Sequence, residues 1–334
     1  MTGQGQLRIN DLQTPALVIE AAVLEKNIAT MSAALPGPRL RPHVKAHKCT
    51  NLARRQAGAG HEGFTCATIR ECEAMMAAGL GQDLLLANEV LDARRLGALA
   101  ADGARITLAV DSPQTIAAAA AGGVKEVVID VNVGLPRCGC DPEKAGQMAA
   151  AAREAGLEVR GVMGYEGHVV GLPDAQERAE QTKTAMEMLV AAHRDVGGEL
   201  VSAGGTGTYQ VNTWANEIQA GSYALMDTAY GKLGLPFGQA LFVLGTVISS
   251  SPQWSVADAG LKAFGMDHGN PDLDGATVWF CSDEHTTFSD PRPVGERVRF
   301  APAHIDPTMA YHERAYVCSG DDVIDVWPID MRGW

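Results

Sequence analysis

The strongest constraint on the fold is an alternation of short apolar runs with alanine-rich helical stretches between residues 40 and 225. The runs have the apolar and β-branched content of buried strands, and good helix formers with glycine near their ends separate them. Eight candidate strands result: Leu40–Ala46, Gly63–Thr68, Asp83–Asn88, Ile106–Asp111, Glu126–Asn132, Glu158–Met163, Leu200–Ala203 and Glu217–Leu225. Because strands separated by helices pair in parallel, the pattern predicts an α/β fold, a (β/α)₈ TIM-type barrel, with an open doubly wound sheet as the alternative.

The pattern changes after Tyr230, where β-rich runs separated by Gly, Pro and Asp turns replace the helical periodicity. These runs are Leu241–Ser249, Thr277–Phe280, Arg297–Phe300, Ala315–Ser319 and Asp322–Trp327. We therefore predict three segments: residues 1–20, an N-terminal strand that joins the β domain; residues 21–237, the barrel; and residues 238–334, a smaller all-β domain.

Composition excludes several classes of protein. The chain has 334 residues, 46% of them hydrophobic, and a net charge of -13 without any basic run, which disfavours nucleic acids and anionic membranes as partners. The N-terminus lacks the layout of a signal peptide, and no apolar run approaches the ~20 residues of a membrane span. Seven cysteines at no disulfide-framework spacing are consistent with a reducing compartment, so we expect a cytoplasmic protein.

The first candidate strand carries two basic groups. His43 and Lys45 interrupt the apolar positions Leu40 and Val44, and charged groups avoid barrel interiors unless they are paired. A desolvated lysine has a lowered pKa, so that a useful fraction of the amine is neutral and can form a Schiff base with a carbonyl cofactor or substrate. The alternative is an edge strand with a solvated basic end.

Two glycine-rich turns follow the seventh and eighth candidate strands, within Ser202–Thr208 and Ala220–Tyr223. Glycines expose backbone N–H groups and Ser and Thr add hydroxyls, and barrels commonly bind phosphate at these two loops. A phosphate cradle together with a reactive lysine describes pyridoxal 5′-phosphate, which couples an aldehyde to a phosphate handle.

At this point the chain resembles a known family. The segment Arg41–Lys48 is similar to the cofactor-lysine motif of the D-threonine aldolase and D-serine dehydratase family, barrel enzymes related to the N-terminal domain of alanine racemase. The resemblance runs from about Thr14 to Trp327. Further segments match the family in order: Asp130–Asn132 with Arg137–Gly139, Gly164–His168, Gly204–Thr208, Gly221–Tyr223 and Asp258–Lys262.

The resemblance implies roles for individual residues. Lys45 would carry the cofactor, Arg137 would contact its phenolic oxygen, and the segment with Tyr165 and His168 would reach the ring and the substrate. The full set of implied cofactor-binding residues is His43, Lys45, Arg137, Tyr165, Ser202, Gly205, Thr206, Gly221, Ser222 and Tyr223.

A metal site is predicted in the β domain. His304 and Asp306 lie two positions apart, so their side chains would share one side of a strand, and an imidazole with a carboxylate suits Mn²⁺, with Mg²⁺ and Zn²⁺ as alternatives. The alternative is a His and an Asp on a solvated strand face. In the family this histidine pairs with Asp in metal-activated aldolases and with Cys in zinc-dependent dehydratases, so the resemblance favours an aldolase.

The implied activity is retro-aldol cleavage of a D-β-hydroxy-α-amino acid to glycine and an aldehyde, with Lys45 and His168 as catalytic residues and either His168 or a metal-bound water as the base. The chain lacks the further histidine that the aldolases carry after this segment, since Val169–Leu172 is apolar. Alternatives are a dehydratase acting on D-serine or 3-hydroxy-D-aspartate, a racemase or epimerase, and a non-catalytic cofactor-binding protein. Family members with this two-domain plan form homodimers, which we also expect here.

Overall fold

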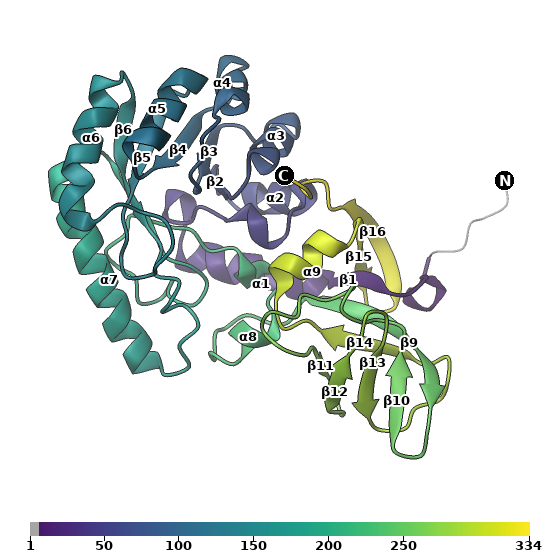
Figure 1. Cartoon of the computed structure of the whole chain (residues 1–334). Helices are drawn as coiled ribbons and strands as arrows, with labels where there is room; N and C mark the ends of the chain where they lie inside the picture. The colour runs from purple at the N-terminus through teal and green to yellow at the C-terminus, as the bar shows by residue number, and fades with distance from the viewer. Residues whose placement is uncertain (1–6) are drawn as a thin grey trace. The chain divides into compact units, whose positions relative to one another are not determined.

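A computed structural model describes residues 7–334 (Figure 1). The described chain forms two compact units, which we call the β unit (residues 7–30, 46–51 and 222–330) and the barrel unit (residues 31–45, 52–221 and 331–334). Among the residues described, no helix has the length and apolar character needed to cross a membrane.

The barrel unit contains a parallel sheet of seven strands in the order β2-β3-β4-β5-β6-β7-β8, which confirms the predicted α/β class. Helices alternate with the strands and cover the outer face of the curled sheet (Figure 1). The strands are β2 (Gly63–Cys66), β3 (Asp83–Leu86), β4 (Ile106–Val110), β5 (Glu126–Asp130), β6 (Glu158–Gly164), β7 (Leu200–Ala203) and β8 (Glu217–Ile218). The helices of residues 50–196 are α2 (Thr50–Gly58), α3 (Ile69–Ala77), α4 (Arg94–Ala101), α5 (Pro113–Gly122), α6 (Ala145–Glu154) and α7 (Ala175–Val196).

The prediction of a regular strand over Leu40–Ala46 is wrong, although its first residues do occupy the eighth place in the barrel. Leu40 forms one parallel bridge to Ile218 of β8, and His43 forms one to Thr65 of β2. Pro42 has no N–H to continue a ladder, and the chain turns into the 3₁₀ helix η3 (Val44–Ala46). Residues 40–43 therefore link the two edges of the sheet, and the lysine lies just beyond them on a helical turn.

Local chemistry explains where the barrel helices begin. The Ser112 side chain caps α5 in a capping box with Thr115, next to a proline at the first helical position, and Gly123 ends the helix with φ of 85°. Asp174 caps the long helix α7 by accepting a hydrogen bond from the backbone N–H of Glu177 at 2.8 Å.

A buried ion-pair network fills the barrel at the amino ends of its strands. Arg41, 3% exposed, contacts Asp83 at 2.7 Å and Glu217 at 2.9 Å, and Arg160 contacts Asp83 at 3.0 Å. Burial alone would lower the pKa of Arg41, but the two carboxylates raise it above its usual value. Because Asp83 and Glu217 begin β3 and β8, this network lies at the opposite end of the strands from the loops where barrel sites form.

The β unit contains a nine-stranded sheet in which seven strands follow the order β12-β13-β10-β9-β1-β15-β16, while β14 pairs with β9 and β11. The N-terminal strand β1 (Ala16–Glu20) lies between β9, which is antiparallel to it, and β15, which is parallel. It is followed by α1 (Ala21–Ala34), of which residues 31–34 belong to the barrel unit. The other strands are β9 (Leu241–Ser250), β10 (Trp254–Ala257), β11 (Asp272–Leu273), β12 (Val278–Cys281), β13 (Thr286–Ser289), β14 (Arg297–Ala301), β15 (Arg314–Ser319) and β16 (Asp322–Pro328).

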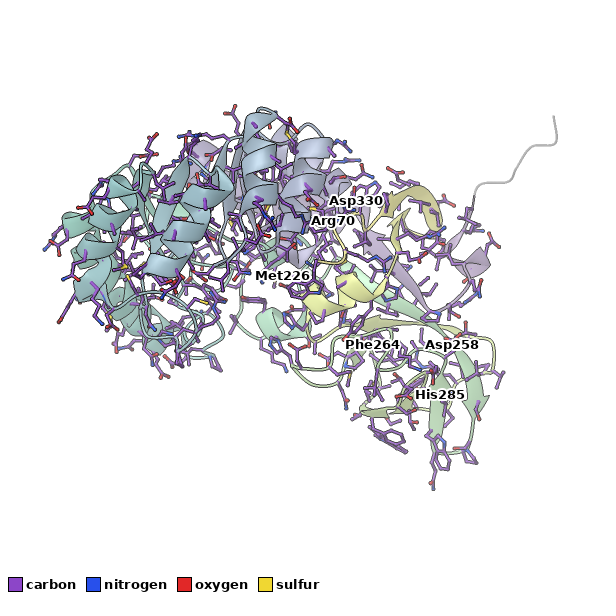
Figure 2. All side chains as sticks on the ribbon, turned by 45° about the horizontal axis from the view of Figure 1, so that its top comes forward. Arg70, Met226, Asp258, Phe264, His285 and Asp330 are labelled. Atoms are coloured by element: carbon purple, nitrogen blue, oxygen red, sulfur yellow. The ribbon has the colours of Figure 1, made fainter. Side chains whose placement is uncertain are left out.

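Two groups of side chains hold this sheet together, one half-buried and one buried, and Figure 2 labels one residue of each. The Asp258 carboxylate accepts hydrogen bonds from the Thr14 hydroxyl at 2.5 Å and the Thr246 backbone N–H at 2.7 Å, joining three segments that are distant in sequence. Phe264 packs edge-on against Phe300 with ring centroids 5.6 Å apart.

The second unit is mostly antiparallel sheet, as expected, and it also contains the short helices α8 (Thr228–Gly231) and α9 (Ile305–Tyr311). His304 is the N-cap residue of α9 and Asp306 lies in its first turn, so the strand on which we placed both residues is wrong. Pro307 is compatible with a first helical turn, where its missing N–H is not needed, and Asp306 is favourable at the positive end of the helix dipole. The Thr308 hydroxyl donates to the His304 carbonyl oxygen at 2.7 Å and fixes the turn.

Candidate functional site

Lys45 lies on η3, immediately after the segment that joins β8 to β2. Its side chain is partly buried between the buried residues Val44 and Ala46, and its backbone N–H is 3.5 Å from Nδ1 of His43. The His43 backbone N–H donates in turn to the carbonyl oxygen of Ala220 at 3.1 Å. Because the strands of the sheet are parallel, Lys45 lies at the same end of the barrel unit as the loops that follow the other strands.

The turn after β7, Gly204–Thr208, is a buried glycine-rich loop. Gly204 has φ of 83°, and the Gly205 N–H donates to the Thr208 hydroxyl oxygen at 3.2 Å. A Cβ at Gly207 would lie 1.8 Å from the carbonyl oxygen of Val170, so only glycine fits there. Thr206 is 1% exposed, so the turn is compact, and glycine-rich turns of this kind can form anion-binding nests.

Ser202 lies one step earlier, within β7 itself, and its buried hydroxyl accepts a hydrogen bond from the Gln219 side-chain amide at 2.8 Å. Gly221 is buried at the end of the loop after β8, and Ser222 begins the 3₁₀ turn η5 (Ser222–Ala224). The Tyr223 ring is fully buried and packs against Phe237 with centroids 5.7 Å apart, so its ring is a core contact of the β unit.

The loops after β5 and β6 meet through two contacts. The Arg137 guanidinium carbon lies 5.2 Å from the centroid of the Tyr165 ring, a cation–π geometry, and both residues line a small cavity of about 10 Å³. His168 is exposed, and its Cε1 lies 2.9 Å from the point where a Cβ at Gly134 would be. The structure therefore brings together the two residues that the sequence predicted to face the cofactor ring and places the predicted base beside them in the same loop.

Buried acids lie next to this loop pair. Burial and the neighbouring Glu89 carboxyl raise the pKa of Asp130 well above its usual value, while Arg137 opposes the shift. Burial and Glu89 also raise the pKa of Cys138 to about 12, so this thiol stays protonated at neutral pH. Asp130 and Cys138 line the same small cavity as Arg137.

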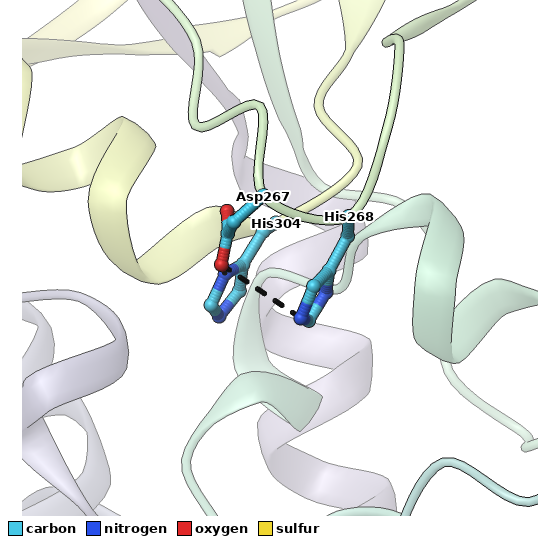
Figure 3. A group of neighbouring side chains, drawn as sticks. All are labelled: Asp267, His268 and His304. Atoms are coloured by element: carbon cyan, nitrogen blue, oxygen red, sulfur yellow. Dashed lines mark hydrogen bonds and ion pairs between the residues drawn. The ribbon is translucent and has the colours of Figure 1, made fainter.

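The β unit holds a second group of candidate residues, of which Figure 3 shows Asp267, His268 and His304. Nδ1 of His304 lies 2.6 Å from Oδ2 of Asp267, and Nε2 of the same ring lies 3.6 Å from Oδ2 of Asp306. Asp267 Oδ2 also lies 3.8 Å from Nε2 of His268. Asp267, His268 and His304 have metal-ligating atoms that all lie within 4.8 Å of one another, and the structure thus brings the predicted pair together and adds two residues.

Backbone contacts explain why these side chains meet. A Cβ at Gly265 would lie 2.2 Å from Cγ of Pro307, so the loop that carries Asp267 approaches the first turn of α9 as closely as glycine allows. The buried Asp227 carboxylate accepts a hydrogen bond from the Ile305 N–H at 3.2 Å, which fixes the start of α9. Burial raises the pKa of Asp227, and its hydrogen bonds and His304 oppose that shift.

The donor set fits one divalent ion between His304 and Asp306. Metal–nitrogen and metal–oxygen bonds of about 2.0–2.2 Å allow a single ion to join two atoms that are 3.6 Å apart. The hydrogen bond from Nδ1 to Asp267 would set the tautomer that presents Nε2 to such an ion. The His268 ring is stacked on His304 at 4.1 Å with 7° between the planes, so the in-plane lone pairs of the two rings do not converge on one point.

Three residues of these sites were missed at the level of sequence. Asp267 and His268 stand side by side in a chain with nine histidines, and that adjacency was the available signal. Glu166 lies inside the segment Gly164–His168 that carries the family resemblance, but nothing in the pattern indicated its contacts.

Comparisons with known proteins match this architecture. Residues 19–229 match the family described as alanine racemase, N-terminal domain, and residues 240–318 match the putative serine dehydratase domain. The chain is 33% identical to the 3-hydroxy-D-aspartate aldolase of Paracoccus denitrificans (strain Pd 1222) and to a D-threonine aldolase of Arthrobacter sp, in each case over 97% of this chain and 93% of the other. It is 28% identical to the D-threo-3-hydroxyaspartate dehydratase of Delftia sp. (strain HT23), over 97% of this chain and 98% of that protein.

Solved structures give the same grouping. The D-threonine aldolase from Filomicrobium marinum superposes with a TM-score of 0.93 at 32% identity over 98% of both chains. A cysteine-to-alanine mutant of a D-threo-3-hydroxyaspartate dehydratase, described as the metal-free form, superposes with a TM-score of 0.86 at 26% identity over 98% of this chain and all of that one, 100%.

Proposed function

Because this chain belongs to the family of alanine racemase N-terminal-domain barrels that includes D-threonine aldolases and 3-hydroxy-D-aspartate aldolases, we propose that it is a lyase that cleaves D-β-hydroxy-α-amino acids to glycine and an aldehyde. The observation that carries the proposal is the His304 and Asp306 pair, spaced for one divalent ion. This pair supports metal assistance of the reaction. Aldol cleavage is supported by the relatives of similar length at 33% identity, which are aldolases.

The barrel unit provides the residues for pyridoxal phosphate, which its family implies. We propose that Lys45 supplies the amine that holds the cofactor, that the turn around Gly205 and Thr206 receives the phosphate, and that Arg137 and Tyr165 face the ring. Ser202, Gly221, Ser222, Tyr223 and His43 stay predictions of the sequence as further cofactor-binding residues. When bound, pyridoxal phosphate supplies an aldehyde that captures an amino group and a ring that stabilises negative charge at Cα.

In the β unit, His304 and Asp306 would hold the metal, which supplies a Lewis acid for the substrate hydroxyl. One imidazole and one carboxylate are borderline and hard donors, so we propose Mn²⁺ in preference to Mg²⁺ or Zn²⁺. The hydrogen bond from Nδ1 of His304 to the Asp267 carboxylate would hold the ring in the orientation that metal binding requires.

We propose His168 as the group that takes the hydroxyl proton when the Cα–Cβ bond breaks. Its imidazole is exposed on the same loop as Tyr165, and histidine is the side chain that most often serves as a general base. Replacing His168 with Asn should lower kcat by about 10²–10⁴-fold and leave cofactor binding unchanged. An unchanged kcat in this variant would remove His168 from the mechanism.

A dehydratase is the second candidate, since the chain matches a D-threo-3-hydroxyaspartate dehydratase over 97% of its length. The two activities give different products from one substrate: 3-hydroxy-D-aspartate would yield glycine and an aldehyde in the aldolase, but ammonia and a 2-oxo acid in the dehydratase.

The test is a product balance on D-threonine and 3-hydroxy-D-aspartate, with pyridoxal phosphate present and with Mn²⁺ either added or removed by a chelator. Glycine in equal amount to aldehyde, dependent on Mn²⁺, supports the proposal. Ammonia and a 2-oxo acid as main products would show a dehydratase, and full turnover after chelation would remove the metal from the reaction. Lys45→Ala serves as the inactive reference.

We further propose that the protein acts as a homodimer in the cytoplasm. All seven cysteines are free thiols, which supports a reducing compartment. Light scattering on the purified protein measures the assembly, and a monomer at micromolar concentration would contradict the first statement. Recovery of the native protein in a membrane or secreted fraction would contradict the second.

A further inference from the structure

Glu166 is a buried acid that neither the proposed reaction nor the sequence pattern accounts for. It follows Tyr165 in the turn after β6 and has no exposed surface, at 0%. Its Oε1 accepts a hydrogen bond from the Thr208 hydroxyl at 2.7 Å, and its Oε2 accepts one from the Gly204 backbone N–H at 3.2 Å. One carboxylate therefore contacts both ends of the glycine-rich turn after β7.

The two turns also touch through their backbones. The Glu166 carbonyl oxygen accepts the N–H of Val169 at 2.8 Å and closes the first turn. The Val170 carbonyl oxygen occupies the space that any side chain at Gly207 would need, 1.8 Å from a Cβ there. The Tyr165 ring lies 3.8 Å from the point where a Cβ at Gly205 would be. Because the two turns are in such close contact, the turn after β6 can shift little without moving the turn after β7.

The charge of Glu166 matters for this arrangement. Burial raises its pKa, while the hydrogen bonds from Thr208 and Gly204 oppose that shift because they favour the ionised form. A carboxylate accepts from both donors at once. A glutamine at position 166 would have only one accepting oxygen. Its NH₂ group would therefore face either the Thr208 hydroxyl or the Gly204 N–H. The Thr208 oxygen already accepts the Gly205 N–H, so its hydroxyl would have to turn to a new partner.

We propose that Glu166 is a positioning residue that locks the phosphate turn, Gly204–Thr208, to the turn that carries Tyr165, so that the grip on the cofactor phosphate depends on one buried carboxylate. The inference rests on the proposed function, because it takes Gly204–Thr208 as the phosphate site. It assigns Glu166 no contact with substrate or cofactor.

The test compares two ligands that differ only in the phosphate. Dissociation constants for pyridoxal phosphate and for pyridoxal are measured by absorbance titration on the wild-type protein, Glu166→Gln and Thr208→Val. The matched control is Glu71→Gln, since Glu71 is also 0% exposed and also accepts a backbone N–H in a loop, that of Ala67 at 2.6 Å after β2. Thermal unfolding verifies that each variant is folded.

We expect Glu166→Gln and Thr208→Val each to weaken pyridoxal phosphate binding about tenfold, because each removes or weakens a charge-assisted hydrogen bond. Pyridoxal binding should weaken less than about threefold, and the double variant should be weaker by clearly less than the product of the two single effects, because both break the same contact. Glu71→Gln should bind both ligands as the wild type does. Equal losses for both ligands in Glu166→Gln, or none, would overturn the proposal.

A second measurement needs no cofactor. Amide hydrogen exchange of residues 204–208 in the free protein should accelerate in Glu166→Gln and not in Glu71→Gln, since the lock exists without ligand. Unchanged exchange there would overturn the proposal even if the wild type binds the cofactor. A wild type that fails to bind pyridoxal phosphate would instead refute the proposed function, while the exchange comparison would still decide whether Glu166 holds the turn.

Discussion

Replacing Arg41 with Met should be among the most damaging single changes to the barrel, although it is remote from the proposed chemistry. Arg41 is 3% exposed and contacts Glu217 at 2.9 Å and Asp83 at 2.7 Å. Asp83 keeps Arg160 at 3.0 Å, but within residues 7–334 the structure gives the Glu217 carboxylate, 6% exposed, no second ion-pair partner. The substitution therefore leaves one buried, uncompensated carboxylate.

Removing one member of a buried ion pair costs about 3–5 kcal/mol of the free energy of unfolding, most of it from the charge left behind. If the unpaired charge causes the loss, removing that charge should restore stability. The double variant Arg41→Met with Glu217→Met should therefore recover more than half of the free energy of unfolding lost in Arg41→Met, since no unpaired charge remains at position 217. The matched control is Arg105→Met, because Arg105 pairs with Glu126 at 2.9 Å but its side chain is 44% exposed, and an exposed pair contributes only about 0–1 kcal/mol.

The assay is urea unfolding followed by circular dichroism, with the visible absorbance of the bound cofactor as a second probe that reports the barrel unit. The assignment of an uncompensated buried charge to this variant is refuted if Arg41→Met costs less than about 1 kcal/mol. It is also refuted if the double variant is no more stable than Arg41→Met.

Three further predictions concern acid, metal and cofactor. Burial would raise the pKa of Asp83, but its two arginine partners lower it below the ordinary value. The stabilisation that follows is present above the ordinary pKa and is lost as the pH falls through the lowered one. The free energy of unfolding, measured at a series of pH values, should therefore drop below about pH 4. Asp267→Asn should weaken Mn²⁺ binding about 10–100-fold in an electron paramagnetic resonance titration, whereas the control Asp283→Asn, at an exposed position, should not. Equal Mn²⁺ affinities of the two variants would show that Asp267 does not orient the ligand His304. Gly207→Ala should abolish tight cofactor binding, because its Cβ would lie 1.8 Å from the carbonyl oxygen of Val170. The control Gly171→Ala, whose Cβ would meet nothing within 4 Å, should bind the cofactor normally. Tight cofactor binding by Gly207→Ala would contradict the close packing of the turn.

The parts of this fold that sequence predicted well are those whose signal is local. The strand-and-helix alternation gave the parallel sheet, since buried strands such as Val127–Ile129 are continuously apolar and Ser112–Pro113 is a strong helix start. The pattern also indicated β structure after Tyr230, where β9 and β15 were found close to their expected limits.

The parts that failed depend on contacts that a linear pattern does not carry. Pro42 stopped a strand that looked continuous by its apolar spacing, because the missing N–H matters only once a neighbouring strand is in place. The start of α9 was hidden because His304, Asp306 and Pro307 have no apolar periodicity, and the helix is fixed from outside by the Asp227 carboxylate.

The candidate sites divide in the same way. Short motifs indicated Lys45 and the phosphate turn, because lysine and glycine-rich runs are chemically distinctive on their own. Glu166 and Asp267 act through residues that are 38 and 37 positions away, Gly204 and His304, so only the folded chain brings them to their partners.

The proposed cofactor site depends most directly on the amine of Lys45. The measurement is borohydride reduction of the protein loaded with pyridoxal phosphate, followed by peptide mass spectrometry to locate the residue that carries the reduced cofactor. We expect the modification on Lys45, at one cofactor per chain, and its loss in Lys45→Ala. Modification of Lys48 or another lysine with Lys45 unmodified, or no modification of any lysine in a protein that binds the cofactor, would contradict it.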